Sequence, residues 1–113
     1  MITIYHNPRC RKSREGLTVL EESGQAFEIV KYLDQPLSKT DLEEIISKLG
    51  IKPIDLIRKN EAIWKSDYKG KDLSDDAIIS AMVEHHKLIE RPIVVNGQKA
   101  VIGRPAENIL NII

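Results

Sequence analysis

The chain is poor in several residue types that common protein functions need. One of its 113 residues is cysteine and 4% are aromatic, and no apolar run approaches the roughly 20 residues of a membrane-spanning helix. A single cysteine excludes a disulfide within the chain, and a chain of this length can bury a core large enough to fold without one. The first ten residues also lack the basic and apolar regions of a signal peptide. We therefore expect a cytoplasmic protein without membrane contact.

Charge and histidine content exclude two further classes. Lys plus Arg and Asp plus Glu number 17 each, so the chain as a whole does not attract nucleic acid, and we expect no nucleic-acid partner. His85 and His86 are adjacent and would diverge on a helix, and no cysteine or histidine spacing matches a metal site. We expect no metal and no tightly bound cofactor.

The N-terminal third predicts a β-α-β unit. Residues 2–5 (ITIY) and 26–32 (AFEIVKY) are rich in β-forming side chains, and the second run alternates between apolar and polar positions. Between them, the residues from Cys10 to about Glu22 favour a helix that Gly24 would end. A strand, a helix and a strand in this order predict a parallel pair.

The middle of the chain predicts helices. Ser38 and Ser74 are placed as N-caps of two amphipathic helices. Pro53 suits the first turn of a short helix that would carry Arg58 near its end. Residues 59–72 are polar and rich in turn-forming residues, and no helix is predicted there.

The last third predicts a hairpin and a closing helix. Asn96-Gly97 lies between two β-branched runs and indicates a type I′ turn, and Pro105 opens the helix. The complete order is β-α-β, several helices, then β-β-α. It predicts an α/β protein of the thioredoxin-like, glutaredoxin-type order. We expect one domain over residues 1–113, with a helical insertion at about 37–88 between its halves.

Cys10 is the strongest candidate for chemistry. It stands where the first strand passes into the first helix, at the edge of an α/β sheet where ligands bind. The helix N-terminus and the flanking cations Arg9, Arg11, Lys12 and Arg14 would both stabilise a thiolate. Such settings lower a thiol pKa from about 8.5 into roughly the 3.5–7.5 range. A lone cysteine is often only a small buried apolar residue, but position and charge here favour a reactive sulfur.

The neighbours of Cys10 exclude two familiar cysteine sites. Ser13 occupies the position of the second thiol in a Cys-x-x-Cys pair, and Gly16 occupies the position of the arginine in a phosphatase-type loop. Cys10 must therefore be regenerated by an external thiol, for which glutathione and glutaredoxin are the obvious candidates. His6 lies in the same turn, where it would either tune the thiol or cap the turn.

Four stretches together resemble a known family. They are ITIYHNPRCRKSR (2–14), IRKN (57–60), IERPIVV (89–95) and IGRP (102–105). In this order and over essentially the whole chain they resemble the glutaredoxin-dependent arsenate reductases. These enzymes form the ArsC-like family of thioredoxin-fold proteins, which also includes the Spx regulators.

The resemblance implies a mechanism and a set of site residues. Cys10 matches the nucleophile, and Arg58, Arg91 and Arg104 match three arginines around the oxyanion, whose shape suits the planar guanidinium. Cys10 would attack arsenate, glutathione and glutaredoxin would reduce the adduct, and arsenite would leave. The resemblance also implies a cis peptide bond before Pro92. We count four residues as supporting the site: His6, Asn7, Ser13 and Pro92.

The sequence also departs from the family, which leaves other functions open. Arg11 and Lys12 follow the nucleophile, where those enzymes usually carry small residues, and would crowd or retune the anion pocket. One alternative is an Spx-like regulator that binds RNA polymerase, although Ser13 removes the Cys-x-x-Cys redox switch. Others are a glutathione-linked thiol protein without arsenate activity and an inactive scaffold.

Overall fold

The chain divides into two compact units. The computed structural model describes all residues from 1 to 113. The first unit combines Met1–Gln35 with Arg91–Ile113, and the second is Pro36–Glu90. The organisation of the chain as one domain stays a prediction. None of the helices has the length and apolar character needed to cross a membrane.

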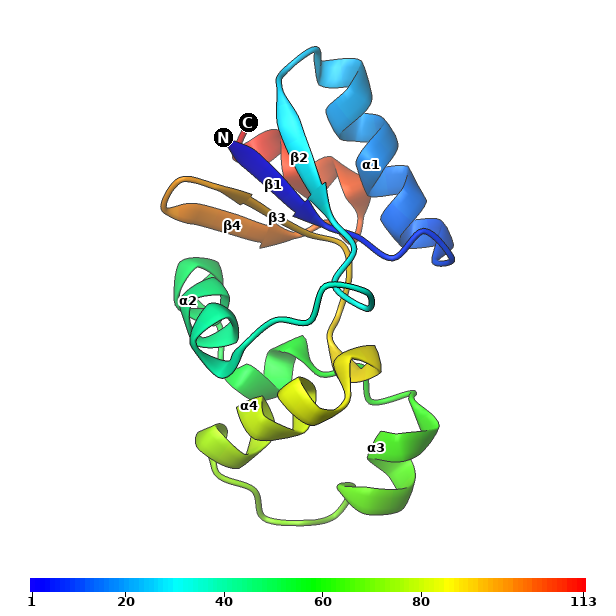
Figure 1. Cartoon of the computed structure of the whole chain (residues 1–113), viewed down its shortest axis with the longest axis vertical. Helices are drawn as coiled ribbons and strands as arrows, with labels where there is room; N and C mark the ends of the chain where they lie inside the picture. Colours follow the sequence, from blue (N-terminus) through cyan, green and yellow to red (C-terminus); the bar gives the residue numbers. More distant parts are fainter. The chain divides into compact units, whose positions relative to one another are not determined.

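The first unit has the predicted thioredoxin-like order. Its four-stranded sheet runs β2-β1-β3-β4, with β1 and β2 parallel and the other neighbouring pairs antiparallel (Figure 1). The elements of the unit are β1 (Ile2–Tyr5), α1 (Arg11–Ser23), β2 (Phe27–Val30), β3 (Ile93–Asn96), β4 (Lys99–Ile102) and the 3₁₀ helix η3 (Ala106–Asn111). The expected β-α-β unit and β-β-α unit are both confirmed.

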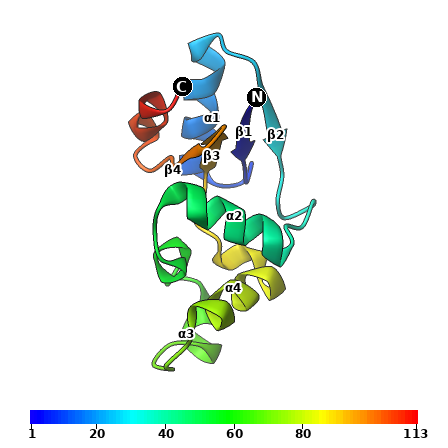
Figure 2. The same cartoon turned by 90° about the vertical axis from the view of Figure 1, so that its left-hand side faces the viewer.

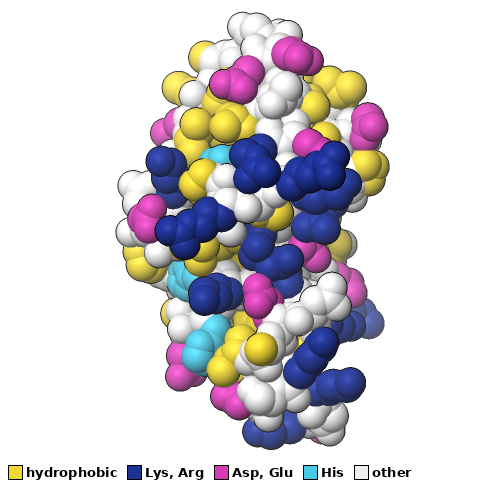
Figure 3. Space-filling view, turned by 90° about the vertical axis from the view of Figure 1, so that its right-hand side faces the viewer, with side chains coloured by type: hydrophobic (Ala, Val, Ile, Leu, Met, Phe, Trp, Pro, Cys, Tyr) yellow, Lys and Arg dark blue, Asp and Glu magenta, His cyan; other side chains and the backbone are white.

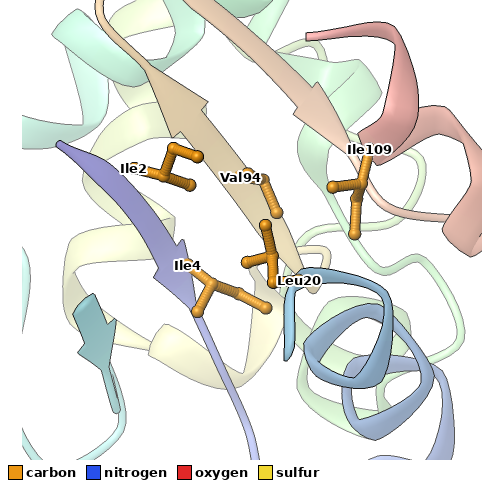
Figure 4. Close-up of a cluster of buried hydrophobic side chains, with 5 residues drawn as sticks. All are labelled: Ile2, Ile4, Leu20, Val94 and Ile109. Carbon is orange, nitrogen blue, oxygen red and sulfur yellow. The ribbon is translucent and has the colours of Figure 1, made fainter. Parts of the chain in front are cut away.

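A small apolar cluster holds the helices of this unit to the sheet. Ile2 and Ile4 are two residues apart on β1 and point to the same side, where they meet Val94 of β3 (Figure 4). Leu20 of α1 and Ile109 of η3 complete the cluster, and all five side chains are buried. Burial of each such side chain contributes about 1.5–3 kcal/mol, so this cluster fixes α1, and with it Cys10, against the sheet.

The β-hairpin forms with a different turn from the predicted one. Asn96 pairs with Lys99 as the last residues of β3 and β4, so the two-residue loop is Gly97-Gln98. Gly97 has φ 63°, and no residue other than glycine has a positive φ. A glycine alone at positive φ in the first loop position is typical of a type II′ turn. The prediction of a type I′ turn at Asn96-Gly97 is wrong because Asn96 remains in the strand.

The second unit is helical. Its elements are α2 (Lys39–Leu49), the 3₁₀ helix η1 (Pro53–Leu56), α3 (Ala62–Asp67), α4 (Asp75–Glu84) and the 3₁₀ turn η2 (His86–Leu88) (Figure 2). Both predicted caps are confirmed. The Ser38 hydroxyl accepts a hydrogen bond from the Asp41 N–H, and the Ser74 hydroxyl accepts one from the Ala77 N–H.

Two expectations for this unit are wrong. The short helix η1 ends at Leu56, so Arg58 lies beyond it, in an extended segment where Ile57 pairs with Ile89. Residues 62–67 form a helix within the stretch predicted to be turn, because Trp64 is buried there at 7% exposure. Burial of a large aromatic side chain stabilises a helix that local propensity does not predict.

Candidate active site

Cys10 is the N-cap of α1. Its backbone is extended, with φ −96° and ψ 123°, and its carbonyl accepts the first helical hydrogen bond from the Arg14 N–H at 3.0 Å. Its own N–H donates to the Asn7 carbonyl at 3.0 Å and closes the turn between β1 and α1. The side chain is half-buried and belongs to the only cysteine of the chain, so no disulfide competes for the sulfur.

A buried polar network fixes this turn. The Ser13 hydroxyl lies 2.7 Å from Nδ1 of His6 and accepts a hydrogen bond from the Asn7 N–H at 3.0 Å. The Asn7 side-chain oxygen in turn accepts from the Arg9 N–H at 3.0 Å. Burial and the charges of Lys31 and Arg14 lower the pKa of His6, so its imidazole is neutral near pH 7. His6, Asn7 and Ser13 are all buried, and together they hold the turn that positions Cys10.

The surroundings of Cys10 favour its ionised form. Burial raises the pKa of the thiol. A hydrogen bond from Arg91, the charge of Arg91, and the N–H groups of Ser13 and Lys12 lower this pKa by more than burial raises it. The pKa of Cys10 therefore lies below its ordinary value. The Cys10 side chain does not accept a capping hydrogen bond that meets the usual distance and angle limits. The first amides of α1 nevertheless stabilise a negative charge on its sulfur. The expected thiolate rests on Arg91 and these amides.

Arg91 is the cation that the structure brings to Cys10. Burial disfavours its charge, but hydrogen bonds to Cys10 and Tyr32 outweigh this cost and raise the pKa of the guanidinium. Its Nε is buried and has no hydrogen-bond partner. Arg91 thus contacts the thiol and the phenol through its terminal nitrogens, while one donor in the planar fork stays unused.

The loop at Pro92 packs tightly against α1. The Arg91-Pro92 peptide bond is cis, as the resemblance implied, and so is the Arg104-Pro105 bond. A Cβ added at Gly16 would lie 2.7 Å from Cγ of Pro92, and one added at Gly103 would lie 2.9 Å from the same atom. The Gly103 N–H also donates to the Pro92 carbonyl at 2.8 Å. Two glycines therefore leave the space in which this proline ring lies next to the helix of Cys10.

The other two predicted arginines have different surroundings. Arg104 follows Gly103 in the first unit, and its side chain is exposed. Arg58 belongs to the second unit, where it forms ion pairs with Glu61 at 2.9 Å and with Glu90 at 3.5 Å. The structure thus joins Arg91 to the thiol and gives Arg58 two carboxylate partners of its own.

The cations that follow Cys10 in the sequence point to solvent. The side chains of Arg11 and Lys12 are 84% and 51% exposed, and both form ion pairs with Glu15 on the same helix. Lys and Arg side chains gather on the face drawn in Figure 3, with Asp and Glu side chains among them. No ion pair or hydrogen bond links the side chain of Arg11 or Lys12 to Cys10.

Three residues of this site escaped prediction from the sequence. Tyr32 is 1% exposed and contacts Arg91, although the sequence places it only at the end of an alternating strand. Gly16 and Gly103 provide the room for Pro92. A glycine inside a predicted helix costs about 1 kcal/mol relative to alanine, so Gly16 carried a signal of close packing.

Fold and site together define a class of protein. It is a thioredoxin-like protein with one thiol of lowered pKa at the start of its first helix and a cis-proline loop beside that helix. A model of the ArsC family matches residues 5–112. The chain belongs to the ArsC family.

Relatives and solved structures agree with this assignment. The chain is 45% identical over 114 residues to an arsenate reductase of Haemophilus influenzae, with 99% of this chain and 98% of that protein covered. It is equally identical over 114 residues to the uncharacterized protein YfgD of Escherichia coli, with coverage of 99% and 96%. The solved structure of an arsenate reductase from Vibrio cholerae superposes with a TM-score of 0.94 at 45% identity, covering 99% of this chain and 97% of that one.

Proposed function

We propose that this chain is an arsenate reductase in which Cys10 is the nucleophile. The contact between Arg91 and the Cys10 sulfur is the observation that carries the proposal. A thiolate and an arsenate oxyanion repel each other, so the reaction needs a cation beside the sulfur. Arg91 provides that cation, and its planar fork suits a tetrahedral oxyanion. The names of the similar proteins from Haemophilus influenzae and Vibrio cholerae support the same substrate.

The reaction divides into two stages. Cys10 attacks arsenic, a sulfur–arsenic bond forms, and one arsenate oxygen leaves as water. Glutathione then displaces a second arsenic-bound oxygen as water and forms its own sulfur–arsenic bond. A glutaredoxin thiol attacks the glutathione sulfur, a glutathione–glutaredoxin disulfide forms, and the electron pair of the broken sulfur–arsenic bond reduces arsenic from the +5 to the +3 state. Water finally cleaves the bond between Cys10 and arsenic, so arsenite leaves and the thiol returns. The external thiols are necessary because the chain has no second cysteine.

The remaining predicted residues take supporting roles in this proposal. Arg104, exposed in the same unit as Cys10, binds oxyanion oxygens alongside Arg91, as the resemblance implies. Arg58 has the weaker case for the same role, because Glu61 and Glu90 already neutralise its charge. His6, Asn7 and Ser13 keep the turn before Cys10 in place through their buried network. Pro92 packs against α1 at Gly16 and sets the position of Arg91, its neighbour in sequence.

The proposal also names partners and location. Glutathione is a co-substrate and glutaredoxin is a protein partner, no cofactor is held tightly, and the reaction takes place in the cytoplasm. This assignment follows from a single thiol that must be regenerated by the reducing thiols of that compartment.

Coupled turnover tests the proposal directly. With arsenate, glutathione, glutaredoxin, glutathione reductase and NADPH, we expect arsenate-dependent NADPH oxidation, and Cys10→Ser should abolish it while leaving the thermal transition unchanged. Omission of glutaredoxin should also stop turnover. A protein with an alkylatable Cys10 that never consumes NADPH with arsenate would contradict the proposal. Capture of RNA polymerase by such a protein would then support the regulator.

A further inference from the structure

The sheet brings three residues to one edge, next to Cys10. In the parallel pair, Tyr5 of β1 lies opposite Val30, and in the antiparallel pair it lies opposite Ile93. The His6 N–H donates to the Val30 carbonyl at 2.9 Å, so the pairing continues past the end of β1. Asn7 and Tyr32 each follow their strand by two residues, and Arg91 precedes β3 by two, so all three lie beyond the same edge of the sheet. Tyr32 lies in a turn and Arg91 in a bend before the cis bond to Pro92.

Residues beyond one sheet edge can contact each other across the end of the central strand. Neighbouring strands are about 4.8 Å apart, so the segment after β2 and the segment before β3 lie about 10 Å apart on either side of β1. A tyrosine and an arginine are long enough to meet over this distance. The strand order therefore allows the hydrogen bond between Tyr32 and Arg91, and Cys10 follows Asn7 by one turn.

Tyr32 is well placed to hold a side chain still. It is 1% exposed, whereas Arg91 is only half-buried and has several rotatable bonds. Nε of Arg91 has no partner, so the terminal nitrogens carry both the contact to the sulfur and the contact to the phenol. A phenol oxygen fixed in the core can accept one of those hydrogen bonds and leave the others directed at the thiol.

We propose that Tyr32 is a positioning residue for the chemistry of Cys10, because its phenol oxygen anchors the guanidinium of Arg91 against the sulfur. Tyr32 touches neither substrate nor sulfur in this scheme and acts through Arg91 alone. The inference deepens the proposed function and depends on it only where arsenate turnover is measured. Its effect on the thiol itself is independent of the substrate.

The test is a double-mutant cycle between Tyr32 and Arg91. The variants are Tyr32→Phe, Arg91→Ala and the double variant, and the iodoacetamide rate of each is measured as a function of pH. Phenylalanine keeps the buried ring and removes only the hydroxyl, and a thermal melt verifies each fold. The matched control is Tyr68→Phe, the same change at a half-buried tyrosine of the second unit.

We expect Tyr32→Phe to move the alkylation midpoint to higher pH and to lower kcat/KM for arsenate by about tenfold, as for a hydrogen bond to a charged group. Tyr68→Phe should change neither. In the Arg91→Ala background, Tyr32→Phe should have no further effect on the midpoint, because the guanidinium through which Tyr32 acts on the thiol is absent. An unchanged midpoint in Tyr32→Phe, or an equal shift in both backgrounds, would overturn the inference. If the wild-type protein shows no arsenate turnover, the proposed function fails, while the alkylation cycle still decides the role of Tyr32.

Discussion

Arg91 and Arg58 belong to different units of the molecule and are stabilised in opposite ways. Arg91 of the sheet unit contacts a thiol and a phenol, and its Nε is buried without a partner. Arg58 of the helical unit forms ion pairs with Glu61 and Glu90 through its guanidinium. Its backbone N–H donates to the Leu88 carbonyl at 2.7 Å. Both side chains are partly buried, yet only Arg58 has carboxylates that neutralise its charge.

The difference lies in whether the positive charge of each arginine is already neutralised by carboxylates. A guanidinium paired with two carboxylates has little electrostatic effect to offer an incoming anion. A guanidinium beside a thiolate stabilises that thiolate and keeps a free donor, at the cost of a buried group without a partner. Functional sites often reduce stability in this way. In the proposed mechanism Arg91 is the cation available to the oxyanion, and replacing Arg58 should therefore have different effects from replacing Arg91.

The largest effect should come from replacing each arginine with lysine. We expect Arg91→Lys to lower kcat/KM for arsenate by at least about tenfold, or about 1.4 kcal/mol, since a point charge cannot replace a planar fork. Arg58→Lys should have a smaller effect because its carboxylate partners accept either cation. Steady-state coupled assays measure both, with Lys48→Arg, at a partly buried lysine of α2 that is paired with Glu44, as a control. A greater loss in Arg58→Lys would reverse the comparison.

The pH dependence of Cys10 alkylation should separate the same two arginines. Because the pKa of Cys10 is lowered, the rate should rise with pH and reach its midpoint below the value of about 8.5 for a free thiol. Arg91→Ala removes a hydrogen bond and a positive charge from the thiolate, so the midpoint should move to higher pH. Arg58→Ala should leave it in place. A wild-type midpoint at or above that of free cysteine would remove the basis of the mechanism.

The sequence predicted the elements of the sheet unit well because its signals are local. The β-branched run at 2–5, the glycine after α1 and the position of Cys10 at the strand–helix junction all follow from neighbouring residues. The cis bond before Pro92 is confirmed through the resemblance. The contact of Tyr32 with Arg91 depends on two segments, distant in sequence, that flank β1 in the sheet, and no local pattern predicts that strand order.

The helical unit shows where local signals fail. Serine caps predicted α2 and α4 correctly, because a cap depends on residues three positions apart. The α3 helix was missed, since its stability comes from burial of Trp64 and not from its polar sequence. The sequence predicts no partner for His86, yet its Nε2 accepts a hydrogen bond from the Leu37 N–H at 2.7 Å. The periodicity of a sequence cannot predict a contact between residues that are 49 positions apart.

Stability should change in the opposite direction from activity. Arg58→Met leaves Glu61 and Glu90 without their cation, so we expect a loss of about 1 kcal/mol in the free energy of unfolding. Arg91→Met removes a buried donor that has no partner together with the hydrogen bonds to Cys10 and Tyr32, and these changes offset each other, so the free energy should change by less than about 1 kcal/mol. Urea unfolding followed by circular dichroism measures both. A larger loss for Arg91→Met than for Arg58→Met would show that Arg91 is primarily structural.

The smallest effect should come from the cations directly after the nucleophile. Arg11 and Lys12 are exposed and paired with Glu15, and exposed ion pairs contribute about 0–1 kcal/mol. The expectation that these side chains crowd the anion pocket therefore has no contact to support it. We expect Arg11→Ala and Lys12→Ala to change kcat/KM for arsenate by less than about twofold, with Lys99→Ala on β4 as a matched exposed control. An increase of more than about fivefold in either variant would mean that a long side chain obstructs the substrate, and the anion site would then extend over the first turn of α1 instead of centring on Arg91.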